Sequence, residues 1–275
     1  MKEKGLILVP TDFTSIGDSA VEYAKQLAKI LKANISLLHV VAKEKDTATA
    51  KNALENIASK LEADGIKANT IVAVGNIFDD IGKVAEDIKA ALIVMGTHGV
   101  SGMQHVLGSK ALKVITNSNV PYIVVQKKPM PKDGFKKILI PLDFNQEVKQ
   151  SVKYAWEIGQ YFKAKIYIAY VKEKDEFIAQ KIERNIPYVV DLLNENNIEH
   201  EIIGLDKKDF TQNLLKYANS NELDLITIIN NHENIFTYFG GSFEQKVIGN
   251  DFEIPVLVIN AIHLKSAYSF SIYFG

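Results

Sequence analysis

The chain contains two copies of one sequence pattern, and this duplication restricts its fold more than any other feature. The segment Ile7–Phe13 returns as Ile138–Phe144, each with an apolar run followed by proline, one further residue, aspartate and phenylalanine. Downstream, Gly108-Ser109 matches Gly241-Ser242. A repeat spacing this long is typical of duplicated domains rather than of a solenoid. With 275 residues, the chain is long enough to bury two cores of ordinary domain size.

A connector rich in proline and lysine separates the two copies. The segment 126–134 holds two prolines, three lysines and a glycine, a composition typical of an exposed and fairly stiff linker. We therefore predict a first domain over residues 1–127 and a second over residues 135–262. Residues 263–275 form an apolar tail that we expect to pack on this chain or on a neighbouring one.

Short apolar runs alternate with longer amphipathic patterns in the first copy. Strands are predicted near residues 6–10, 34–41, 67–74, 91–95 and 121–126, with helical periodicity between them. This alternation is typical of a parallel sheet with right-handed crossovers. The fold class predicted for each copy is therefore a doubly wound α/β domain.

A glycine-rich segment follows the fourth predicted strand. Ala91–Met95 has the apolar sequence of a fully buried parallel strand, and Gly96, His98 and Gly99 come directly after it. Gly108-Ser109 then opens an apolar helix whose first N–H groups would face the same crevice. Ligands of open α/β sheets bind at the carboxyl ends of the strands, so we interpret the segment as a phosphate cradle. An ordinary tight loop is the alternative.

Asp12, just beyond the first strand, has two interpretations of equal weight. An ionised carboxylate only accepts hydrogen bonds, so it could recognise the amino group of a nucleobase at this edge of the sheet. Alternatively, it caps the next helix together with Thr14 or Ser15.

Composition argues against several other classes of protein. The net charge is −1 without a basic stripe, which gives no reason to expect nucleic acid. No apolar run is long enough to span a membrane and no signal peptide is recognisable, so we expect a cytoplasmic protein. The chain has no cysteine, which excludes thiol catalysis and cysteine metal sites. His98 and His105 lack the spacing of metal ligands, and His39 is interpreted as a partly buried packing residue. We predict no metal site and no catalytic residue.

These motifs resemble the universal stress protein family in its tandem form. The resemblance covers nearly the whole chain and rests on Pro10-x-Asp12, His39-Val40, Gly75 and the run Ile93–Gly99 leading to Gly108-Ser109. It implies two doubly wound five-stranded parallel-sheet domains with strand order 3-2-1-4-5, of the adenine-nucleotide alpha-hydrolase-like type. It also implies ATP or another adenine nucleotide as ligand, with Mg²⁺ as an optional companion.

The resemblance also implies roles for individual residues. In nucleotide-binding members, the matching aspartate and the strand-two valine backbone hold adenine, and the glycine loop and following serine hold ribose and phosphates. The site residues that follow are Pro10, Thr11, Asp12, Val40, Met95, Gly96, His98, Gly99, Gly108, Ser109 and Lys110. The segment Val100–Leu107 is one residue shorter than in the family pattern.

The second copy departs further from that pattern. Asn230–Glu233 replaces the glycine segment, and Phe236, Tyr238 and Phe239 follow it, so we interpret this copy as degenerate. Members of the family commonly dimerise through their fifth strands. The resemblance therefore implies that Tyr122–Val125 pairs with Val256–Ile259 within this chain, which would form an intrachain pseudo-dimer. Whether two chains also form a homodimer stays open.

The first hypothesis for function is a stress-response regulator that binds an adenine nucleotide in its N-terminal domain and signals to an unknown protein partner. Arg184 is the only arginine, so phosphoryl transfer would lack its usual charge stabilisation and at most weak ATP hydrolysis is expected. Two alternatives stay open: a scaffold without nucleotide, favoured by the shortened loop, and a carrier of small ligands using the aromatic second crevice.

Overall fold

The computed structural model describes residues 5–96, 120–142, 159–230 and 243–260. The first half of the chain contains β1 (Leu6–Pro10), α1 (Ser15–Leu31), β2 (Asn34–Val41), η1 (Glu44–Asp46), α2 (Thr47–Ala63), β3 (Ala68–Val74), α3 (Ile77–Asp87), β4 (Leu92–Gly96) and β5 (Tyr122–Val125). The second half contains β6 (Lys137–Pro141), β7 (Lys165–Lys172), α6 (Glu176–Glu195), β8 (His200–Asp206), α7 (Phe210–Ser220), β9 (Leu225–Asn230), α9 (Phe243–Ile248) and β10 (Val256–Asn260).

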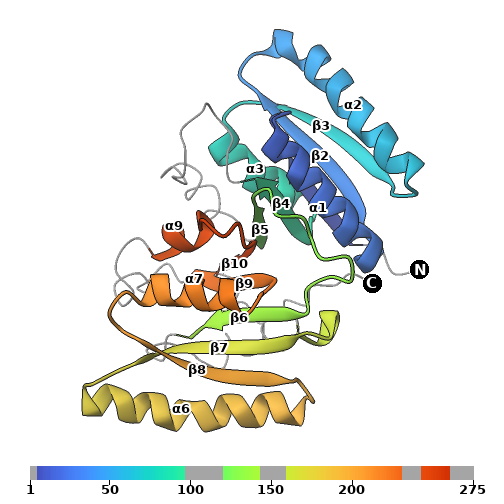
Figure 1. The fold of residues 1–275 in the computed structure, drawn as a ribbon. Coiled ribbons are helices and arrows are strands. Elements are labelled where there is room, and N and C mark those ends of the chain that lie inside the picture. The colour runs from blue at the N-terminus through green and yellow to red at the C-terminus, as the bar shows by residue number, and fades with distance from the viewer. Residues whose placement is uncertain (1–4, 97–119, 143–158, 231–242, 261–275) are drawn as a thin grey trace.

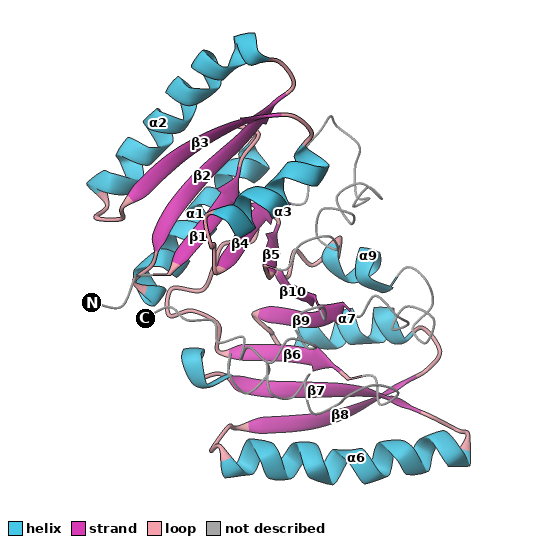
Figure 2. Cartoon of the chain, turned by 180° about the vertical axis from the view of Figure 1, so that it is seen from behind, coloured by secondary structure: helices cyan, strands magenta, loops and turns pink. Residues whose placement is uncertain are grey.

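All ten of these strands belong to one sheet, with the order β3-β2-β1-β4-β5-β10-β9-β6-β7-β8 (Figures 1 and 2). The pairs within each half are parallel, as in β1 with β2 and β6 with β7. The predicted α/β class with a mostly parallel sheet is confirmed. The five strands of each half join into one continuous sheet, because their fifth strands pair with each other.

The seam between the halves is the antiparallel pair of β5 and β10. Val256 lies opposite Val124, Leu257 opposite Ile123, and Val258 opposite Tyr122, so the pairing expected between these segments is present. The pairing removes an exposed edge from each half, which favours its formation. Beyond the seam, the side chain of Gln126 donates a hydrogen bond to the carbonyl of Asn250 (2.8 Å).

Helices cover both faces of the sheet, which explains why the strands read as continuous apolar runs. On one face, α1, α2 and α6 contribute Leu27, Leu54 and Leu193 to the core. On the other, α3, α7 and α9 contribute Ile81, Leu214 and Val247. All six of these side chains are at most 1% exposed, and they occur at the helical spacing that places apolar residues on one side.

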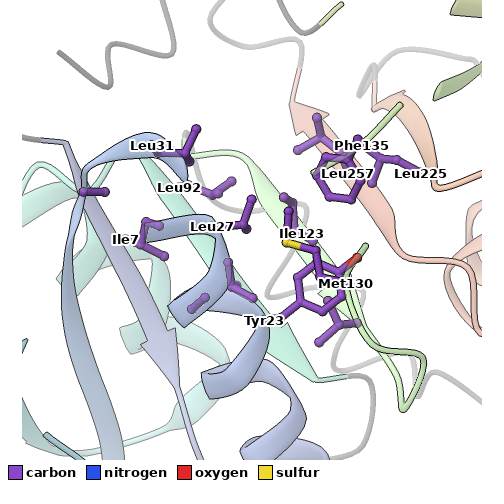
Figure 3. Close-up of a cluster of buried hydrophobic side chains, with 14 of the residues drawn as sticks. Ile7, Tyr23, Leu27, Leu31, Leu92, Ile123, Met130, Phe135, Leu225 and Leu257 are labelled. Carbon is purple, nitrogen blue, oxygen red and sulfur yellow. The ribbon is translucent and has the colours of Figure 1, made fainter. Parts of the chain in front are cut away.

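The linker between the halves is partly buried. Lys127 and Lys132 are exposed as predicted, but Met130 and Phe135 are only 4% and 0% exposed and pack in the core beside Tyr23 of α1 (Figure 3). The prediction of an exposed linker is therefore wrong at Met130, and Phe135 is the first residue after the predicted linker. An apolar side chain between two prolines reaches the core wherever the chain passes close to it, and composition alone does not reveal that path.

Among the described residues, no helix has both the length and the apolar content needed to cross a membrane. The cytoplasmic location stays a prediction.

Candidate functional site

Several of the predicted site residues meet at the carboxyl edge of the first half of the sheet. Pro10 ends β1 opposite Leu38 of β2, and β4, the other neighbour of β1, ends in Met95 and Gly96. Val40 lies near the end of β2, and Thr11 donates its backbone N–H to the Leu38 carbonyl (2.9 Å). The crossovers leave β1 in opposite directions here, and at such a switch point open α/β sheets bind ligands.

The Asp12 carboxylate is oriented by the residue that caps α1. The Thr14 hydroxyl donates to Asp12 Oδ1 (2.6 Å), the Thr14 N–H donates to the same oxygen (3.1 Å), and Thr14 Oγ1 accepts from the Gly17 N–H (3.3 Å). Thr14 is therefore the N-cap, and its two hydrogen bonds to the Asp12 carboxylate hold it in the capping position. In the part of the chain that the structure describes, Asp12 Oδ2 accepts no hydrogen bond, so one acceptor of this half-buried carboxylate is left for a ligand.

Two glycines let the first turn of α1 approach the strand ends closely. A Cβ on Gly96 would lie 2.5 Å from Ile16 Cγ2 and 3.1 Å from the Ile16 carbonyl oxygen, and a Cβ on Gly17 would lie 2.9 Å from Asp12 Oδ1. The positive end of the α1 dipole consequently lies beside β1 and β4. Gly17 was not among the predicted site residues, although a glycine in the first turn of a helix, where its propensity is poor, could have indicated it.

The remaining predicted site residues lie outside the described part of the chain. They are His98, Gly99, Gly108, Ser109 and Lys110. The phosphate cradle therefore stays a prediction. Among the described residues, no group of three or more histidine, aspartate or glutamate side chains could hold a metal ion.

The second half carries different residues at the same positions of the sheet. Leu8 pairs with Ile93 in the first half as Leu139 pairs with Ile226 in the second. The register of the strands therefore puts Ile229 at the place of Gly96, one residue before the segment Asn230–Glu233 that the sequence predicts there. By the sequence repeat, Val148 takes the place of Gly17. Branched residues thus replace both glycines that permit close packing in the first half, which supports the interpretation of the second copy as degenerate.

Sequence reasoning missed a buried carboxyl group in the second half. Glu244 lies in the first turn of α9 and is only 4% exposed. Burial raises the pKa of the Glu244 carboxyl to about 7, because a charged form is poorly solvated there. By the repeat, Glu244 takes the place of Ala111. A carboxyl group at this position opposes the binding of an anionic phosphate.

This carboxyl group should make stability depend on pH. The folded-state pKa is raised, so the stability linked to Glu244 is present below the unfolded pKa and is lost as the pH rises toward about 7. Glu244→Gln should therefore stabilise the protein by about 1–3 kcal/mol near pH 8 and have little effect near pH 4. Chemical denaturation at several pH values measures this difference. Glu176→Gln, on the exposed first turn of α6, is the control, and an equal gain at both pH values for Glu244→Gln would contradict the assignment.

Comparisons with known proteins agree with this architecture. Residues 5–126 match the model of the universal stress protein family. The chain is 32% identical to universal stress protein MJ0577 of Methanocaldococcus jannaschii over 44% of this chain and 94% of that protein. It is 31% identical to MJ0531 of the same organism over 44% of this chain and 81% of that protein. A universal stress protein structure from Archaeoglobus fulgidus superposes with a TM-score of 0.77 and 21% identity, covering 94% of this chain and 99% of that one. This structure shares the fold along almost the whole chain.

Proposed function

The chain belongs to the universal stress protein family, and we propose on that basis that the first half of its sheet binds an adenine nucleotide. The observation that carries the proposal is the Asp12 carboxylate, which Thr14 fixes through Oδ1 while Oδ2 keeps its capacity to accept. Adenine presents an amino group that donates hydrogen bonds, and a carboxylate matches it.

The other half of the ligand would lie toward β4. Gly96 brings the end of that strand against the first turn of α1, and the sequence places Gly99, Gly108 and Ser109 just beyond it. In the proposed complex, Asp12 and the Val40 backbone hold the base, and the backbone N–H groups of the glycine loop and the helix start hold ribose and phosphates. We also assign Pro10, Thr11, Met95, His98 and Lys110 to the proposed site, and Mg²⁺ would accompany the phosphates when present.

We assign nucleotide binding to a domain over residues 1–127 and propose that a second domain, residues 135–262, serves as its pseudo-symmetric partner. Ile229 and Glu244 support that division, because they stand where the first half has small residues. The proposed role is regulatory: the bound nucleotide alters contacts with a partner protein, in a cytoplasmic setting.

The test uses the purified full chain. Released ligand is identified by mass spectrometry, and thermal unfolding is followed with ATP, ADP and AMP. A nucleotide present at 100 times its Kd should stabilise the native state by roughly 2.7 kcal/mol. Guanine nucleotides at the same concentration are the control and should stabilise less. Absence of both a copurifying nucleotide and any thermal shift would make the scaffold the better description.

A further inference from the structure

His39 contacts the turn that carries Asp12. Its ring Nδ1 lies 2.7 Å from the carbonyl oxygen of Thr11, and a carbonyl only accepts, so Nδ1 carries the proton. The Thr11 N–H donates to the Leu38 carbonyl at 2.9 Å. Strand β2 therefore holds the backbone of Thr11 at both its N–H and its carbonyl group, directly before Asp12.

Phe13 holds the other side of Asp12 in an unusual conformation. Its φ of 62° lies in the left-handed region, which residues with a bulky side chain rarely adopt. Two contacts maintain it: the Phe13 N–H donates to Thr11 Oγ1 (3.2 Å), and its ring centroid lies 4.4 Å from that of His39. The ring is still 37% exposed, so apolar burial alone does not account for the conformation. Strained residues of this kind gather at ligand sites.

We propose that His39, Phe13 and Thr11, here called the His39 clamp, position the Asp12 carboxylate for the amino group at C6 of a purine. His39 is a positioning residue in this arrangement and does not touch the ligand. The inference rests on the proposed function and extends it to base specificity: the clamp makes the site prefer a 6-aminopurine over a 6-oxopurine. Thr14 fixes one carboxylate oxygen, and the clamp fixes the backbone on both sides of Asp12.

The second half carries a different residue at the position of His39, although it keeps the same backbone hydrogen bond between these two strands. Leu142 donates its N–H to the Ala169 carbonyl (2.8 Å), as Thr11 does to Leu38. The position of His39 is taken by Tyr170, whose ring lies over Gly204, where a Cβ would be 2.9 Å from its Cζ. A tyrosine has no ring N–H for the neighbouring carbonyl. Of the two matching strand positions, which the structure describes in both halves, only the one in the proposed nucleotide-binding half therefore carries an imidazole donor.

The test compares the affinities of ATP and inosine triphosphate, which carries an oxygen at C6. Wild type should bind ATP at least about tenfold more tightly, as expected for a hydrogen bond to a charged group. His39→Phe should lose most of this preference through a lower ATP affinity while the inosine triphosphate affinity stays near that of wild type. His39→Asn, whose side-chain amide can donate to the Thr11 carbonyl, should restore the preference. Tyr170→Phe is the matched control in the second half and should behave as wild type.

A second variant distinguishes loss of the clamp from misfolding of the protein. Phe13→Gly accepts the positive φ without strain but removes the ring that packs on His39, so it should fold and still lose the ATP preference. Preserved discrimination in His39→Phe and Phe13→Gly would overturn the clamp, as would an equal loss of both ligands, which indicates a merely structural role. Failure of wild type to bind either nucleotide would instead overturn the proposed function.

Discussion

Gly96→Ile should abolish the nucleotide-induced thermal shift and lower the free energy of unfolding by about 1–3 kcal/mol, the usual cost of overpacking. Isoleucine is the residue that the second half carries at this place. A single Cβ on Gly96 would already lie 2.5 Å from Ile16 Cγ2, and the nearby Ile16 carbonyl belongs to the backbone of α1. The helix start must therefore move, and the Asp12–Thr14 turn moves with it.

The same substitution at Gly204 is the control for Gly96→Ile. Gly204 lies on the edge strand β8. A Cβ there would meet the outer ends of two side chains of β7, with Lys172 Cε at 2.8 Å and Tyr170 Cζ at 2.9 Å. Gly204→Ile should keep nucleotide binding. Chemical denaturation and thermal shift with ATP measure both properties. Wild-type stability together with a full shift in Gly96→Ile would show that the close packing of α1 on β4 is not required.

Asp12→Asn should lower the affinity for ATP about 10- to 100-fold, since a hydrogen bond to an ionised group is lost. The asparagine carbonyl can still accept from Thr14, so the cap of α1 and the melting temperature of the free protein should change little. The amide nitrogen of the asparagine then takes the place of Oδ2. Its N–H group would face the amino group of adenine, and neither group can accept a hydrogen bond from the other. For the same reason, the affinity for inosine triphosphate should rise relative to that for ATP.

Asp143→Asn is the matched control, because Asp143 is the repeat of Asp12 in the second half. Titration calorimetry should give it the wild-type affinity for ATP. An unchanged affinity in Asp12→Asn, or an equal loss in both variants, would show that Asp12 does not recognise the base.

The fold could be predicted from sequence because its main determinants are local or repeated. Buried parallel strands such as β1 and β4 are continuous apolar runs, and the recurrence of the Ile7–Phe13 pattern implies a second copy. The pairing of β5 with β10 could be predicted from the family resemblance and from the cost of leaving the edges of these two strands unpaired. These features do not depend on the angle at which any one helix crosses the sheet.

The site was less predictable because its geometry depends on approach between distant segments. Sequence left open whether Asp12 caps α1 or binds a ligand, and the structure divides the tasks: Thr14 caps, and Asp12 supports Thr14 with one oxygen only. His39 is partly buried and packs on Phe13 as predicted, but its ring Nδ1 also lies 2.7 Å from the Thr11 carbonyl oxygen, which the sequence did not indicate. That contact joins residues 28 positions apart, and no local pattern specifies it.

The central claim is that one half of this duplicated sheet binds an adenine nucleotide and the other half does not. Titration calorimetry of the wild-type chain with ATP tests it most directly by counting the nucleotides bound per chain. The asymmetry between Gly96 and Ile229 predicts one. Two nucleotides per chain, or none, would contradict it.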